Sequence, residues 1–187
     1  EYNPSGKLPM SFPRSVGQIP IYYNHKNTGR PGADGEDAGS VFWSHYIDEK
    51  NSPLFPFGYG LSYTSFNYSN IELNKNSLEN NDDDYLIASI EISNTGDFKG
   101  KEVVQLYLHD KYASVTRPVK ELKGFEIIEL DPGKSKKVSF KITKKMLEFY
   151  YEKNDWISGW GAEPGDFDLY IGTSSATKRK IEFKLLK

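Results

Sequence analysis

The sequence predicts a mainly β protein, in which a sandwich of two antiparallel sheets follows an irregular extended segment. From Phe66 onward, about seven short runs alternate apolar and polar residues, and turn residues separate the runs at regular spacing. A period of two is typical of strands with one buried face, and two sheets can bury such faces against each other. Residues 1–53, in contrast, lack sustained periodicity.

The first 53 residues are expected to be mostly extended or looped. Residues 7–13 form a short extended piece between prolines, and residues 19–23 are the best local strand candidate. Pro20 lacks an amide donor, which confines that candidate to a sheet edge or a strand end. Residues 27–35 carry the turn residues of a loop. So long a segment with so little regular structure seldom folds alone, and we expect it to lean on the remaining chain or on a domain outside this sequence.

The stretch between the two regions is uncharged and dense in aromatic residues. Pro56 fixes one backbone angle, whereas Gly58 and Gly60 permit angles that other residues avoid. A flexible linker would be polar, so residues 54–66 are predicted to be a packed hinge.

The strand region is predicted in order along the chain. Phe66 and Tyr68 begin a strand that Ile71 and Leu73 continue on the opposite parity, which indicates a bulge near Ser69. Residues 76–84 are predicted to be a polar surface turn, and residues 144–151 fit either a helical turn or an irregular strand. The remaining apolar faces lie at positions 86/88/90/92, 104/106/108, 138/140/142, 167/169/171 and 181/183/185, and Leu122, Phe125, Ile127 and Leu130 supply another strand region.

Composition excludes several classes of function. The 187 residues carry a net charge of −2, which provides no field for nucleic acid or an anionic membrane surface. No apolar run approaches the roughly 20 residues of a membrane span. The sequence has no cysteine and therefore no disulfide or thiol chemistry. Glu1 is not an initiator residue, so we expect the sequence to be part of a longer chain.

Catalytic and metal-binding patterns are not evident in the sequence. His25, His45 and His109 lack metal-ligand spacing, and the acidic runs 34–37 and 82–84 lack the alternation of a calcium loop. No Gly-x-Ser-x-Gly elbow and no phosphate-binding glycine loop occurs. The lysines at 134, 136, 137, 144 and 145 are interpreted as an exposed strand face with its turn. No cofactor and no metal is therefore expected.

Three motifs carry a resemblance to a known family. Residues 56–64, Pro-Phe-Gly-Tyr-Gly-Leu-Ser-Tyr-Thr, resemble the entry to the C-terminal domain of family 3 glycoside hydrolases, the β-glucosidase family. Residues 3–14 are similar to the close of that family's α/β sandwich domain. Residues 117–125, Arg-Pro-Val-Lys-Glu-Leu-Lys-Gly-Phe, followed by 130–135, resemble the signature of its fibronectin type III-like domain. The three motifs occur in the family's order and span most of the chain.

The resemblance implies a fold, a domain division and a parent activity. Residues 1–65 would be the C-terminal tail of the α/β sandwich domain plus the linker, and residues 66–187 an immunoglobulin-like, fibronectin type III-like β-sandwich. It also favours a short turn followed by a strand at 149–151. The parent would hydrolyse terminal β-linked glucose or a related sugar with retention, using two carboxylates about 5–5.5 Å apart. In the family both carboxylates precede the region resembled here, so no residue of this sequence is predicted to be catalytic.

Partners and location follow from the same resemblance. The expected partners are the parent's own catalytic domains and its oligosaccharide substrate, with neither nucleic acid nor a membrane. The family is often secreted or periplasmic, which suggests a periplasmic or extracellular location.

A few residues are candidates for contact with sugar. Arg30, Trp43 and Tyr59 are the candidates for the rim of the parent's active site. Aromatic rings can stack on pyranose faces, and Tyr22, Trp156 and Trp160 are further candidates, although core or interface packing is the commoner role of such rings. Two alternatives stay open. A carbohydrate-binding module would expose a row of coplanar rings, and a partner-binding fibronectin-like domain would expose a large apolar patch on the sandwich itself.

Overall fold

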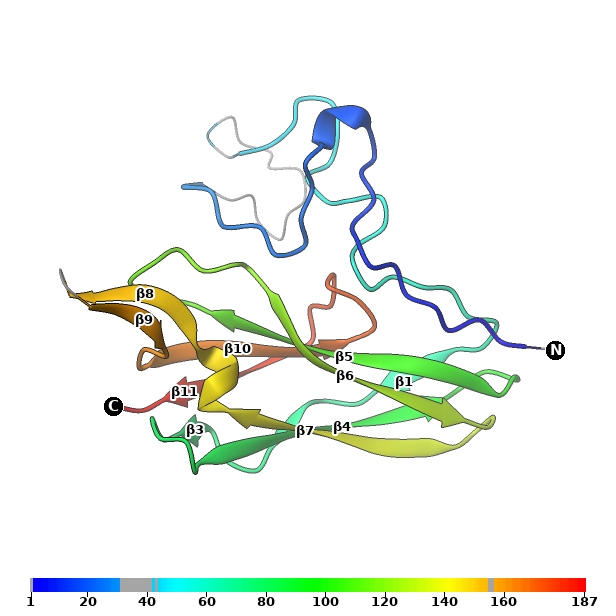
Figure 1. Cartoon of the computed structure of the whole chain (residues 1–187). Helices are drawn as coiled ribbons and strands as arrows, with labels where there is room; N and C mark the ends of the chain where they lie inside the picture. The colour runs from blue at the N-terminus through cyan, green and yellow to red at the C-terminus, as the bar shows by residue number, and fades with distance from the viewer. Residues whose placement is uncertain (1, 31–41, 43, 155–156) are drawn as a thin grey trace.

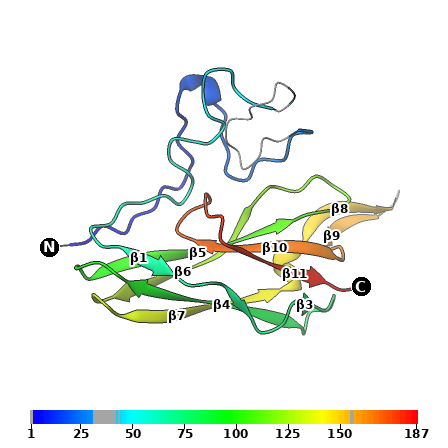
Figure 2. The same cartoon turned by 180° about the vertical axis from the view of Figure 1, so that it is seen from behind.

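The protein is a two-sheet β-sandwich with an extended N-terminal segment lying across one sheet (Figure 1). A computed structural model of the chain describes residues 2–30, 42, 44–154 and 157–187. The predicted fold class is confirmed. Figure 2 shows the same arrangement from behind, with the N-terminal segment on the outer side of the sheet that contains β5 and β10. No helix among the described residues has the length and apolarity that crossing a membrane requires.

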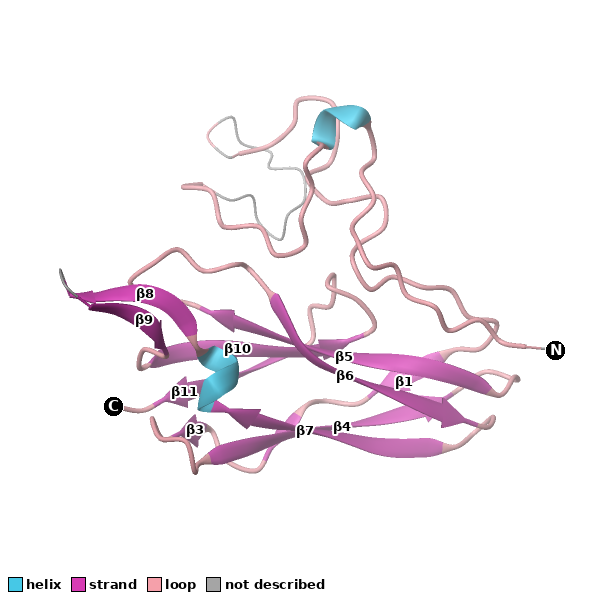
Figure 3. Cartoon of the chain, viewed as in Figure 1, coloured by secondary structure: helices cyan, strands magenta, loops and turns pink. Residues whose placement is uncertain are grey.

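Each sheet has a simple antiparallel core. In the first sheet β4 lies between β7 on one edge and the pair β1 and β2 on the other. The second sheet has the order β3-β11-β10-β5-β6, in which only the β3–β11 pair is parallel, and β8 and β9 form a separate hairpin (Figure 3). The bounds are β1 Phe66–Tyr68, β2 Glu72–Leu73, β3 Ser77–Leu78, β4 Tyr85–Asn94, β5 Gly100–Asp110, β6 Glu121–Leu130, β7 Ser135–Thr143, β8 Phe149–Asn154, β9 Ile157–Gly161, β10 Gly165–Gly172 and β11 Lys180–Leu185, with 3₁₀ turns η1 Val16–Gln18 and η3 Lys144–Leu147.

The core lies between the two sheets. Leu86, Ala88, Ile90 and Ile92 of β4 are all buried, as are the apolar residues expected for β5 and β10, whereas Phe140 of β7 is partly buried. In β6 the buried residues are Ile128 and Leu130, and Phe125 and Ile127 are exposed, which the sequence pattern did not predict. Each strand therefore contributes one apolar face, and the hydrophobic effect fixes which parity points inward. The turn η3 followed by β8 matches the turn and strand expected after residue 143.

The predicted bulge near Ser69 is confirmed by the register of pairing. Tyr68 pairs with Ile92, but Glu72 pairs with Ser89, so four steps along β1–β2 face three steps along β4. One extra residue is therefore accommodated, and the backbone amide of Glu91 donates to the Ser69 hydroxyl at this point. The insertion lets both Tyr68 and Ile71 reach the core from opposite parities.

Two element predictions are wrong. Residues 19–23 form no strand: the Ile19–Pro20 bond is cis, and Tyr23 packs its ring on the hinge instead. The turn predicted at 76–84 contains β3, whose Leu78 is fully buried and pairs with Leu185. A strand of two residues is too short for alternation to reveal it. The described chain has more strands than the seven expected. The additional ones include the two-residue strands β2 and β3 and the hairpin of β8 and β9.

In the N-terminal segment, two extended stretches of the chain pair with each other and pack against the sandwich. The amide of Leu8 donates to the carbonyl of Tyr59, the amide of Gly58 donates to the carbonyl of Leu8, and Phe12 pairs with Phe55. The extended piece expected at residues 7–13 is thus present, with the aromatic hinge as its partner. Figure 1 shows this ladder in blue and cyan above β5 and β6.

Candidate functional site: the seam between the N-terminal segment and the sandwich

The seam is the contact between residues 3–26 and 54–64 of the N-terminal segment and the outer face of the second sheet. At its centre the Gln105 side-chain amide donates to the carbonyl of Gly58 at 3.1 Å and to that of Thr173 at 2.7 Å, while its oxygen accepts from Tyr107. Gln105 and Tyr107 belong to the outward parity of β5, yet both are buried. The hinge therefore converts an exposed sheet face into an internal one.

Glycine is required at two places in the hinge. Gly58 has φ +78°, and a Cβ atom there would lie 2.1 Å from Oε1 of Gln105. Gly60 has an ordinary φ, but a Cβ atom would lie 2.4 Å from the carbonyl oxygen of Gly6. The permissive backbone angle expected from the sequence occurs at Gly58, whereas Gly60 is needed for close approach of two backbone segments.

An ion pair fixes the start of the segment. The Lys7 ammonium lies 3.2 Å from Oε1 of Glu102, and the Tyr68 hydroxyl donates to the same oxygen at 3.0 Å. The Glu102 side chain is buried, so both partners are needed to offset its desolvation. Burial and the neighbouring Glu102 carboxylate raise the pKa of the Tyr68 hydroxyl, which stays protonated as a donor.

A second contact holds residues 23–26. The Tyr23 ring stacks on Phe57 with centroids 4.2 Å apart and meets the Tyr107 ring edge-on at 6.1 Å. The Tyr23 hydroxyl oxygen accepts from the amide of Leu122 at 3.3 Å. Next to it, the amide of Val119 donates to the carbonyl of His25 at 2.9 Å.

The signature at 117–125 supplies the sandwich side of this contact. The Lys120 ammonium donates to the carbonyls of Ser175 and Thr177 at 2.9 and 2.5 Å and lies 4.2 Å from the Tyr170 ring centroid. Desolvation by burial lowers the pKa of Lys120 to about 8, partly opposed by the negative charge of Asp168. Lys120 thus ties the chain before β6 to the loop after β10.

Arg117 is the second cation of the signature. Its guanidinium donates to Glu121 at 2.6 Å and lies 4.4 Å from the Phe149 ring centroid, which docks the β8–β9 hairpin. Asp110 lies beside it, with 3.9 Å between Nε of Arg117 and Oδ2. Burial raises the pKa of the Asp110 carboxyl to about 6, although the charge of Arg117 opposes this shift. The signature residues therefore have structural partners within the sandwich.

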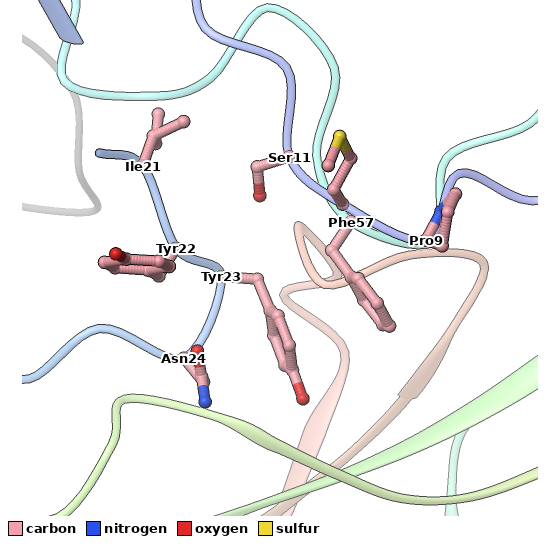
Figure 4. A pocket seen from close by; sticks show the side chains of 8 residues that line it. Pro9, Ser11, Ile21, Tyr22, Tyr23, Asn24 and Phe57 are labelled. Atoms are coloured by element: carbon pink, nitrogen blue, oxygen red, sulfur yellow. The ribbon is translucent and has the colours of Figure 1, made fainter. Parts of the chain in front are cut away.

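A cavity of about 210 Å³ opens beside the seam (Figure 4). Its wall is mostly apolar, and Figure 4 shows Tyr23 and Phe57 lying side by side at its floor. The lining residues are Pro9, Met10, Ser11, Ile21, Tyr22, Tyr23, Asn24 and Phe57. The described part of this wall contains no acid, so the cavity offers no pair of carboxylates for hydrolysis.

The three rim candidates are not gathered into one site. Arg30 is exposed, with its guanidinium carbon 6.0 Å from the Phe42 ring centroid. Tyr59 is half-buried and packs on Phe55 with centroids 5.1 Å apart. Trp43 lies outside the described residues. The role of all three at a substrate rim stays a prediction.

Of the other aromatic candidates, two are exposed and one is not described. Trp156 lies outside the described residues, Tyr22 is exposed at the cavity, and Trp160 is 65% exposed. Trp160 meets the exposed Tyr150 at an interplanar angle of 77°. This described pair is T-shaped, which differs from the coplanar row that a carbohydrate-binding module would present.

His109 and Asp84 have local hydrogen-bond partners. His109 hydrogen-bonds through Nδ1 to the carbonyl of Val119 at 2.6 Å, and Asp84 accepts from the amide of Glu79. Within the described ranges no group of three His, Asp or Glu residues is arranged to hold a metal ion. Of the lysines interpreted as an exposed face, only Lys144 is half-buried.

Sequence reasoning missed the residues that make the seam. Gln105 lies on the polar parity of β5, as a surface residue would, and Lys120 resembles any surface lysine. Two signals were available: Tyr107 is an aromatic residue on the polar parity, which indicates that something covers that face, and Glu102 is an acid on the apolar parity.

Comparisons with known proteins identify the two regions. Residues 1–63 match the model of the glycosyl hydrolase family 3 C-terminal domain, and residues 102–175 match that of the fibronectin type III-like domain. This chain belongs to family 3 of the glycoside hydrolases. The seam is therefore the contact between those two parts of a family 3 protein.

Relatives in family 3 extend over the whole chain. A periplasmic β-glucosidase of Salmonella typhimurium is 50% identical over 186 residues, covering 100% of this chain and 23% of the relative. A putative β-xylosidase of Formosa agariphila is 46% identical, with 100% and 22% coverage. The crystal structure of a β-glucosidase from Listeria innocua in complex with gluconolactone superposes with a TM-score of 0.88 at 43% identity, covering 100% of this chain and 25% of that one. The chain thus spans less than a third of the length of these relatives.

Proposed function

We propose that this chain is the non-catalytic C-terminal part of a β-glucosidase-type hydrolase and that it braces the catalytic domains of the whole enzyme. The division falls near residue 65, with the sandwich holding the segment that precedes it. The partners are the enzyme's own catalytic domains, and the whole enzyme acts with retention on oligosaccharides that end in β-linked glucose or a related sugar.

The distribution of exposed apolar side chains carries this proposal. Of the large apolar side chains that are exposed in the described structure, thirteen lie in residues 1–65 and nine in the much longer remainder. Leu61 and Tyr63, for example, are 71% and 72% exposed. Large contiguous apolar surface is rare on soluble monomers, so this concentration of exposed apolar side chains supports a protein interface on the segment. Its place on the segment, and not on the sandwich, favours a brace over a free partner-binding domain.

The seam gives the brace its stiffness. Gln105 and Glu102 of β5 hold two extended stretches of the segment. The Tyr23 hydroxyl is bound by the amide of Leu122, within the signature at residues 117–125. A docked catalytic domain would therefore rest on the sandwich, not on a linker. Arg30, Trp43 and Tyr59 are proposed to lie at the edge of its substrate site.

The name of one relative bears on the location of the whole enzyme. One relative is named as periplasmic, and we propose a periplasmic or extracellular place for the whole enzyme.

Turnover tests the proposal directly. The isolated chain is expected to release no nitrophenol from 4-nitrophenyl β-glucoside or β-xyloside, whereas the whole enzyme does, because both reactive carboxylates would lie outside these 187 residues. Among the described residues, the buried acids of the sandwich are Glu102, Asp110 and Asp168, and E102Q, D110N and D168N serve as controls. Turnover by the isolated chain that any of these substitutions abolishes would refute the proposal.

A further inference from the structure

We propose that residues 117–122, called here the positioning segment, place the Arg30 side chain for substrate by holding residues 23–26. This inference rests on the proposed function, because Arg30 meets substrate only in the whole enzyme. Arg30 itself contacts no residue of the sandwich among the described contacts. Any influence of the sandwich on Arg30 must therefore pass through the chain that leads to it.

The contact between the two segments is formed largely by backbone. The amide of Val119 donates to the carbonyl of His25 at 2.9 Å, and Lys26 pairs with Pro118 as an antiparallel bridge. Only three residues lie between Lys26 and Arg30. Because the connection is so short, a displacement of this bridge would also displace Arg30. Misplacement of a substrate contact by about 1 Å can lower the rate by a large factor.

The positioning segment is itself immobilised. Lys120 holds two carbonyls of the loop after β10, and Arg117 is held between Glu121 and the Phe149 ring. Both cations point back into the sandwich, leaving the backbone of Pro118 and Val119 to face the N-terminal segment. The segment is thus a fixed support whose backbone edge is paired with residues 25–26.

Tyr23 links this support to the hinge. Its ring lies against Phe57 on one side and Tyr107 on another, and its hydroxyl oxygen accepts from the amide of Leu122. One side chain therefore contacts the hinge, the sheet and the positioning segment. It is the residue whose loss would release residues 23–26 from all three.

Hydrogen bonds also connect Arg30 to the chain that precedes the hinge. The amide of Ser44 donates to the carbonyl of Arg30 at 2.9 Å, and the Asn51 amide donates to the carbonyl of Ser44 at 2.8 Å. Gln18, which is buried, donates to the carbonyl of Lys50 at 2.6 Å. These bonds join residues 30 and 44–51 to each other and to the N-terminal segment, whereas residues 23–26 provide the direct contact between this part of the chain and the positioning segment.

A double-mutant cycle in the whole enzyme tests the inference. Tyr23→Leu is expected to raise KM for cellobiose about five-fold while kcat changes less than about two-fold, because ground-state placement is lost and the chemistry is untouched. Arg30→Ala is expected to raise KM as well. If Tyr23 acts through Arg30, Tyr23→Leu adds nothing further in the Arg30→Ala background.

Control variants keep the test independent of folding. Tyr23→Phe keeps the ring and removes only the acceptor for Leu122, so it should give a smaller rise in KM with an unchanged melting temperature. Tyr85→Leu, on the opposite sheet, removes a half-exposed tyrosine and should leave KM unchanged.

Each outcome decides one claim. If Arg30→Ala leaves KM unchanged, Arg30 is not at the substrate rim, and both that part of the proposed function and the inference fail. If Arg30→Ala raises KM but neither Tyr23 variant does, the proposed rim stands and the positioning role fails. Additive effects of Tyr23→Leu and Arg30→Ala would also overturn it, because Tyr23 would then act by another route.

Discussion

Single residues decide where the N-terminal segment meets the sandwich. Gln105 is the best example, because its amide group is buried with every donor and acceptor satisfied by the hinge, the loop after β10 and Tyr107. Leaving such a group unpaired costs about 1–3 kcal/mol. The sequence predicted a special backbone at Gly58 but not its partner, since a glutamine on the outer parity of a strand normally faces water.

Gly58→Ala should destabilise the isolated chain more than Gly133→Ala. Both glycines have positive φ, +78° and +71°, so each alanine costs about 1–2 kcal/mol of backbone strain. Around Gly133 no atom lies within 4 Å of the added methyl group, whereas at Gly58 the methyl group would overlap Gln105. We expect Gly58→Ala to lose about 3 kcal/mol or more of unfolding free energy in urea. Equal losses for the two variants would show that the hinge does not press on Gln105.

At the scale of elements, alternation predicted the strands that form the core and missed those that do not alternate. β4 and β10 carry four or three apolar residues on one face, and these were identified correctly. β3 has two residues, and residues 19–23 resemble a strand locally but are recruited by the hinge through Tyr23. Their conformation depends on contacts far away in the sequence, which a local pattern does not contain.

The connection between β5 and β6 should respond to pH through Asp110. Burial raises the pKa of its carboxyl to about 6, with Arg117 opposing and Glu163 and Glu121 adding to the shift. An unfolded aspartate titrates near 4, so the folded protein binds this proton more tightly. The stability contributed by Asp110 is therefore full below about pH 4 and is lost as pH rises through about 6.

D110N removes this titration. The unfolding free energy of D110N minus that of the wild type should rise from pH 4.5 to pH 7.5, because only the wild type must ionise a buried carboxyl. Urea denaturation at several pH values measures the difference. The attraction between Arg117 and the ionised carboxylate is already included in the pKa of about 6, so it lessens the rise without reversing it. A difference that stays flat would mean that Asp110 titrates as it does in the unfolded chain.

At the scale of the whole molecule, the family motifs predicted more than periodicity did. Alternation alone indicates a two-sheet sandwich, whereas the motifs at 56–64 and 117–125 indicated the family to which the chain belongs. Neither showed that Tyr23 links the two motifs, with its ring on Phe57 and its hydroxyl oxygen accepting from the amide of Leu122. That link is a property of the folded chain: an aromatic residue of the hinge, Phe57, stacks on Tyr23, whereas the cations of the signature hold its own segment on the sandwich.

The central claim is that the exposed apolar side of residues 1–65 docks on the catalytic domains. Leu61→Asp tests it most directly, since Leu61 is 71% exposed in this chain. The melting temperature should be measured for the isolated chain and for the whole enzyme, with Tyr85→Asp on the opposite sheet as the control. We expect Leu61→Asp to leave the isolated chain within about 1 °C of wild type, as surface substitutions usually do, but to lower both the melting temperature and the activity of the whole enzyme. A whole enzyme that tolerates Leu61→Asp as well as it tolerates Tyr85→Asp would contradict the account.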